Sequence, residues 1–189
     1  MSLFKGISGD LSNADIGWIK DKSASFEYGY KLAAEKLSDG FEKLDTRSKD
    51  SLIFPIVFLY RQYIEITLKG IITELDSFLQ NDRQDKLLER HKLLNLWDEA
   101  EKLYRQFIKK NSIELVFTPA KSSKERCVIK DFNKLDEDSF CFRYATDKRG
   151  NETLPSVDYI SLNNFKSQIS IVIEYMDNIT ETLAHARDI

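Results

Sequence analysis

Apolar residues recur at helical spacing along three long stretches of the chain. One stripe within residues 23–44 has steps of three or four, and residues 51–79 and 162–183 carry similar but longer stripes. Because residues three and four apart share a face of an α-helix, each stretch predicts a helix with one buried side. The stretch 51–79 is apolar nearly all round, so we expect it to be the central helix. Pro55 then either sits in its first turn or kinks it.

The remaining chain is less regular. Residues 87–110 predict a third helix and 128–138 a short fourth, whereas 113–117 fits either a short strand or a buried loop. Alternation of aromatic and polar residues over 139–144 favours an extended segment. Residues 146–153 predict a turn centred on Gly150 and Asn151. We therefore predict an all-α, single-domain helical bundle of about five helices over residues 21–189. Residues 1–20 form an irregular lead-in, and residues 112–156 are irregular and partly extended.

Composition supports one globular domain. The 189 residues are 42% hydrophobic and 31% charged, with few glycines and prolines. The formal net charge of −3 gives no overall basic field for nucleic acids, although it does not exclude a local basic cleft. The apolar run 52–60 has only about half the roughly 20 residues that span a bilayer. We expect a cytoplasmic protein that does not associate with membranes, with Cys127 and Cys141 as free thiols.

Motifs of common enzyme chemistry are not visible in the sequence. The two histidines and two cysteines lie at spacings unrelated to a zinc site, and there is no glycine-rich phosphate loop, nucleophile elbow or calcium-loop pattern. We therefore expect no metal and no cofactor.

The apolar stretch 58–72 carries a row of three charges at four-residue spacing, Arg61, Glu65 and Lys69. One interpretation is a set of solvent-facing ion pairs, each contributing about 0.2–0.5 kcal/mol. The other is a functional or interface site, because a partly buried charge must be paired or used, and arginine suits the binding of phosphate or carboxylate.

Three segments resemble the HEPN superfamily of helical proteins. FLYRQYIEITLKGIITEL contains the E-x-x-x-K-like row of Glu65 and Lys69, and RHKLLNLWDEA resembles a GHxLxxLW-like helix start, with His91 and Trp97. FRYATDKRGN (142–151) resembles an FRYPxDxxG segment of bacterial members, and the likeness spans roughly residues 25–185.

The resemblance implies a homodimeric helical bundle with a polar cleft between subunits. It also implies an RNA- or nucleotide-directed module of a bacterial toxin–antitoxin or phage-defence system, with a cognate antitoxin or other partner protein. Five residues would line this cleft: Arg61 and Arg143 would hold phosphate, Glu65 would orient an arginine, Lys69 would add positive charge, and His91 would transfer protons. The catalytic pair would be His91 with Arg61, and the implied activity is that of a metal-independent endoribonuclease.

The R-x(4–6)-H motif of the nuclease members is absent. Arg90 is adjacent to His91, and Arg83 lies seven intervening residues upstream of it. The sequence therefore leaves open whether the protein is an enzyme. The alternative is a non-catalytic interaction or dimerisation module whose charged row sets register or partner choice. In that case His91 is a polar residue of a helix start, and Arg143 anchors the irregular segment to Glu65 or another carboxylate.

Overall fold

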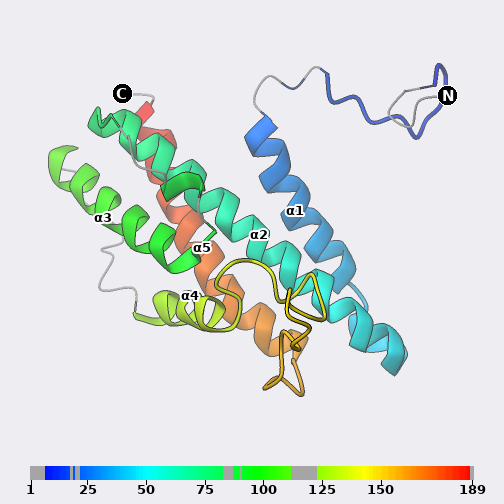
Figure 1. Ribbon diagram of the computed structural model, residues 1–189. Helices are drawn as coiled ribbons and strands as arrows, with labels where there is room; N and C mark the ends of the chain where they lie inside the picture. The colour runs from blue at the N-terminus through cyan, green and yellow to red at the C-terminus, as the bar shows by residue number, and fades with distance from the viewer. Residues whose placement is uncertain are drawn as a thin grey trace.

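The computed structural model describes residues 7–17, 19, 22–82, 87–89, 91–111 and 123–187. Within these residues it contains five α-helices, two short 3-10 helices and no β-strand. The helices form a bundle (Figure 1). The predicted all-α bundle of about five helices is therefore confirmed.

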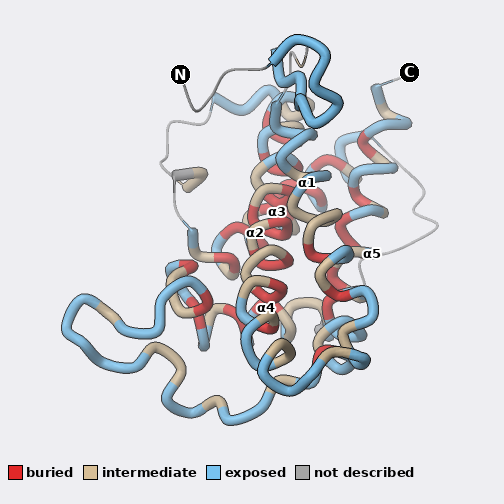
Figure 2. The backbone as a smooth tube through the Cα atoms, turned by 90° about the vertical axis from the view of Figure 1, so that its right-hand side faces the viewer, coloured by how far each residue is buried: buried red, intermediate tan, exposed pale blue. Residues whose placement is uncertain are grey.

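The central helix is α2 (Thr46–Leu79), whose side chains supply much of the core. Its N-terminus is capped by Asp45, whose side chain accepts a hydrogen bond from the Ser48 backbone N–H at 3.0 Å. Because the helix begins at Thr46 rather than near Ser51, Pro55 lies in its interior and not in its first turn. The backbone tube in Figure 2 shows burial concentrated where the other helices pack around α2.

By length and composition α2 could also cross a membrane, but 56% of its apolar window is buried inside the bundle. A core helix of a soluble protein passes the same test, and this burial is compatible with the expected soluble protein.

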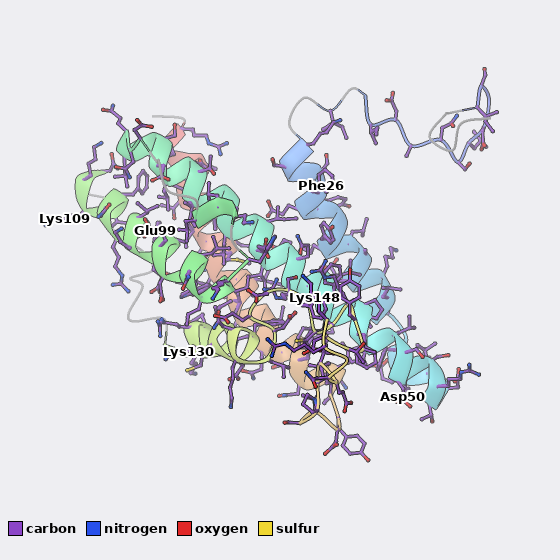
Figure 3. The ribbon with its side chains drawn as sticks, viewed as in Figure 1. Phe26, Asp50, Glu99, Lys109, Lys130 and Lys148 are labelled. Atoms are coloured by element: carbon purple, nitrogen blue, oxygen red, sulfur yellow. The ribbon has the colours of Figure 1, made fainter. Side chains whose placement is uncertain are left out.

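The first helix, α1 (Lys22–Ser38), packs against α2 and is shorter than the predicted stripe. Gly40, with a left-handed φ of 68°, separates it from a 3-10 turn at Phe41–Lys43. Phe26 belongs to the apolar stripe within residues 23–44 that was predicted to be buried, but its side chain is 58% exposed on the outside of α1 (Figure 3). The stripe is therefore buried only over the later turns, where α1 contacts α2.

Three further helices complete the bundle: α3 (Leu93–Asn111), α4 (Ser123–Leu135) and α5 (Leu162–Arg187). Both α3 and α5 pack against α2 and α4. The third helix begins later than predicted, because Leu87–Glu89 forms a separate 3-10 turn. Trp97 of α3 stacks on Tyr175 of α5 with ring centroids 5.0 Å apart.

Residues 136–161 join α4 to α5 without regular structure. The predicted extended segment over 139–144 is wrong, because these residues form turns around the Asp136 side chain, which accepts hydrogen bonds from the Phe140 and Cys141 backbone N–H groups. The predicted turn over 146–153 is confirmed: Thr146 and Glu152 pair as an antiparallel bridge, and Gly150 has a φ of 85°. The ambiguous segment 113–117 lies outside the described residues.

Residues 7–17 are irregular and exposed, and they run away from the bundle (Figure 1). This part of the chain fits the predicted irregular lead-in.

Candidate functional site: a charge cluster between α2, α3 and α4

Arg61 is completely buried, with 0% of its side chain exposed. Its guanidinium extends from α2 to two backbone segments that are distant in sequence. Nη2 donates to the carbonyl oxygen of His91 at 2.7 Å and to that of Glu137 at 3.3 Å, while Nε donates to the carbonyl oxygen of Asp136 at 3.3 Å. Arg61 thereby connects the start of α3 to the end of α4.

Two buried carboxylates lie against the Arg61 guanidinium. Nη1 of Arg61 donates to Glu65 Oε2 at 3.1 Å, and Nε lies 3.4 Å from Asp136 Oδ2. Asp136 Oδ2 makes no hydrogen bond, so its contact with Arg61 is purely electrostatic. With four hydrogen bonds from a group that has five N–H donors, Arg61 has almost no capacity left for a ligand.

Glu65 is the centre of the cluster, and its side chain is only 2% exposed. While Oε2 accepts from Arg61, Oε1 accepts from Lys69 Nζ at 2.9 Å and lies 2.8 Å from His91 Nδ1. Burial on its own would raise the pKa of Glu65, but the hydrogen bonds and charges of Lys69 and His91 outweigh it and hold the pKa below its ordinary value. The carboxylate is therefore ionised at neutral pH.

The cluster reaches solvent at two side chains. The His91 side chain is 55% exposed and that of Lys69 is 24% exposed. Because an ionised carboxylate can only accept hydrogen bonds, His91 Nδ1 must carry the proton that points to Glu65. In the neutral imidazole this leaves Nε2 as the basic nitrogen. The arrangement is a carboxylate-oriented histidine with an ammonium group beside it.

Arg143 does not join the cluster. Its Nε donates to the Ser139 carbonyl oxygen at 2.6 Å, and its guanidinium lies 5.7 Å from the Phe58 ring centroid and 5.4 Å from that of Tyr144. Ser139 and Tyr144 lie in the same irregular segment as Arg143, so of these three contacts only the one with Phe58 joins that segment to α2. Arg143 lines a separate hollow of about 1050 Å³ between α2 and the 141–160 segment.

Four of the five predicted residues, Arg61, Glu65, Lys69 and His91, are thus brought together. Sequence reasoning missed Asp136, which is 1% exposed and contacts both Arg61 and the following turn. Its only local signal is its place in the acidic run after α4, which it shares with Glu137 and Asp138. Within the described ranges, no group of three or more His, Cys, Asp or Glu side chains could hold a metal ion.

No protein-family model, curated protein or solved structure compared with this chain matches it. The fold and the site therefore describe the protein as an all-α bundle with a buried arginine–carboxylate cluster, from which one histidine and one lysine reach the surface.

Proposed function

We propose that the chain is a HEPN-like, RNA- or nucleotide-directed module that cleaves RNA without a metal ion. In this proposal it acts as a homodimer in the cytoplasm, in a bacterial toxin–antitoxin or phage-defence system. One observation carries the chemical part: a single buried carboxylate oxygen, Glu65 Oε1, holds both His91 Nδ1 and Lys69 Nζ within 2.9 Å.

The proposed chemistry uses His91 Nε2, the ring nitrogen that does not face Glu65. His91 Nε2 would take the proton of a ribose 2′-OH, and the 2′ oxygen would attack the adjacent phosphorus. As the bond to the 5′ oxygen breaks, the imidazolium can return the proton to that leaving oxygen. Lys69 would supply positive charge for the phosphate, and Glu65 would orient the ring and stabilise the imidazolium.

Arg61 takes a different role from the one that the resemblance implies. Because its guanidinium is fully buried and bonded to three carbonyl groups, we assign it to positioning rather than to phosphate binding. By holding the His91 carbonyl oxygen it fixes the backbone from which the imidazole extends.

RNA cleavage in EDTA tests the proposal. Total bacterial RNA would be incubated with the wild type, with His91→Ala and with His185→Ala. His185 is the chain's other histidine and is exposed on α5, which makes it the matched control. We expect cleavage by the wild type and by His185→Ala but not by His91→Ala. Absence of cleavage by folded wild type, or full activity in His91→Ala, would overturn the catalytic part.

A non-catalytic interaction module is the second candidate. The observation that favours it is the burial of Arg61 and Glu65, since buried charged groups can set register and fold specificity. In that case we expect His91→Ala to leave partner binding unchanged, and we expect substitutions of Arg61 to affect binding by destabilising the folded protein.

A further inference from the structure

A groove lies between α1 and α5, with α2 beneath it. Its volume is about 900 Å³. Among its apolar lining residues Leu32 and Ile173 are half-buried, whereas Tyr60 and Ile169 are buried beneath the surface. None of the charge-cluster residues Arg61, Glu65, Lys69 and His91 lines it. Figure 2, which faces α1, shows α5 next to it along the bundle. The groove is thus a surface separate from the proposed catalytic site.

Carboxylates outnumber cations around the groove. The acidic lining residues are Glu35, Asp39, Glu174, Asp177 and Glu181, and the basic ones are Lys31, Lys36 and Lys166, which gives 3 − 5 = −2. Lys31 is already engaged, because its Nζ lies 3.9 Å from Asp177 Oδ2 and 5.4 Å from the Tyr63 ring centroid. The groove therefore has an excess of negative charge over an apolar base.

The same negative field acts on the tyrosines beneath the groove. Burial raises the pKa of Tyr63, and the charges of Asp177, Glu27 and Glu35 raise it further. Burial likewise raises the pKa of Tyr60, with additional contributions from Glu35 and Asp39. Burial is the main cause of both shifts, and the nearby carboxylates add to it because negative charge disfavours a phenolate.

The shape of the groove suits a helix. Its walls are two helices, and the lining residues of α5 run from Lys166 to Glu181, which is roughly 22 Å at about 1.5 Å per residue. An amphipathic helix laid between them would place its apolar side on the half-buried Leu32 and Ile173 and its flanks against the carboxylates.

We propose that this groove binds a basic amphipathic helix of a partner protein. Apolar burial supplies the attraction, and charge complementarity selects lysine- or arginine-rich helices over acidic ones. The inference goes beyond the proposed ribonuclease activity and does not depend on it.

The probe is a fluorescein-labelled Leu/Lys peptide of about four helical turns with leucines on one face. Fluorescence anisotropy would measure its binding to the full chain. The peptide controls are a scrambled sequence of the same composition and an analogue with glutamate in place of lysine. We expect the amphipathic basic peptide to bind, with both controls at least about tenfold weaker.

Charge reversal locates the binding surface. Glu174→Lys with Glu181→Lys changes two exposed groove residues, and Asp131→Lys with Glu152→Lys is the matched control outside the groove. We expect the first pair to weaken binding about tenfold and the control pair to leave it unchanged. Both pairs are exposed, so circular dichroism should show a folded chain.

Equal binding by both pairs, equal binding of the scrambled peptide, or no binding at about 1 mM peptide would overturn the proposal. Self-association that is lost in the groove pair would also overturn it, since a second copy would then occupy the groove. His91→Ala should retain peptide binding, so failure of this inference and failure of the ribonuclease proposal are distinguishable.

Discussion

Replacing Arg61 by Met should destabilise the protein by about 3 kcal/mol or more, because breaking a buried ion pair by removing one partner costs about 3–5 kcal/mol. Methionine keeps most of the side-chain length and removes the charge. The buried carboxylates of Glu65 and Asp136 lose their shared cation, and three backbone carbonyl groups lose a donor.

The remaining contacts place the loss near the lower end of that range. Glu65 keeps Lys69 and His91, and Asp136 Oδ1 keeps the two backbone N–H groups of the following turn. For a chain of this size, about 3 kcal/mol corresponds to a Tm lower by roughly 6–12 °C.

Arg126→Met is the matched control. Arg126 binds both Asp98 oxygens, at 2.7 and 2.8 Å, which are shorter distances than most of those at Arg61. Its side chain is 33% exposed, however, and an exposed ion pair contributes only about 0–1 kcal/mol. Urea unfolding followed by circular dichroism should therefore give a much larger loss at Arg61 than at Arg126.

Equal losses in the two methionine variants would refute the reasoning that burial, rather than hydrogen-bond length, sets the cost. If Arg61→Met does not fold, Arg61→Lys provides the test, since it restores the charge but not the forked geometry. We expect Arg61→Lys to fold and to be intermediate in stability.

Three other predictions concern separate contacts. The folded-state pKa of Glu65 is below its ordinary value, so its contribution to stability is present above about pH 5 and is lost as the pH falls through the lowered pKa. The difference in unfolding free energy between the wild type and Glu65→Gln should accordingly become smaller as the pH is lowered from 7 to 3.5. A difference that does not change with pH would contradict a lowered pKa of Glu65. Asp45→Ala removes the cap on the Ser48 N–H and should cost about 1 kcal/mol in urea unfolding, whereas Asp50→Ala on an exposed turn of α2 should be near neutral. Ser139→Gly should stabilise by about 0.5–1 kcal/mol, because Ser139 has a left-handed φ of 58° and its buried Oγ lacks a partner; a lower Tm would show that the strain is not relieved.

Helix positions were predictable because their signal is local. The apolar stripes of α2 and α5 repeat every three or four residues, and that spacing survives whatever the helix packs against. The start of α2 was predicted five residues too late, near Ser51, because the apolar stripe begins after the helix itself, which is capped by Asp45.

The segment 139–144 was misread because its conformation depends on a tertiary contact. Its alternating aromatic pattern fits a strand, but Asp136 is fixed beside Arg61 and captures the backbone N–H groups of Phe140 and Cys141. A carboxylate held from outside the segment thus outweighs the local preference.

In the candidate site, too, the contacts within one helix could be predicted from the sequence, whereas those that depend on tertiary packing could not. The row Arg61, Glu65 and Lys69 could be identified from sequence, because four-residue spacing guarantees proximity on a helix. The 2.8 Å approach of His91 to Glu65 depends on how the turn before α3 packs on α2. The resemblance, rather than the spacing, suggested that meeting. The same resemblance grouped Arg143 with His91, whereas in the structure Arg143 contacts Ser139, Phe58 and Tyr144.

The residues of the charge cluster differ in their exposure to solvent, and this difference determines which variants can test function without unfolding the protein. Arg61 is fully buried, Lys69 is partly exposed and His91 is more exposed still. Loss of activity in an Arg61 variant would therefore combine an unfolding effect with any effect on chemistry. Since His91 contributes its ring at the surface and its carbonyl oxygen to Arg61, His91→Ala removes the proposed proton-transfer group and its contact with Glu65 while keeping the backbone contact with Arg61. His91→Ala, with His185→Ala beside it, is thus a better test of the proposed catalysis than any variant of the fully buried Arg61.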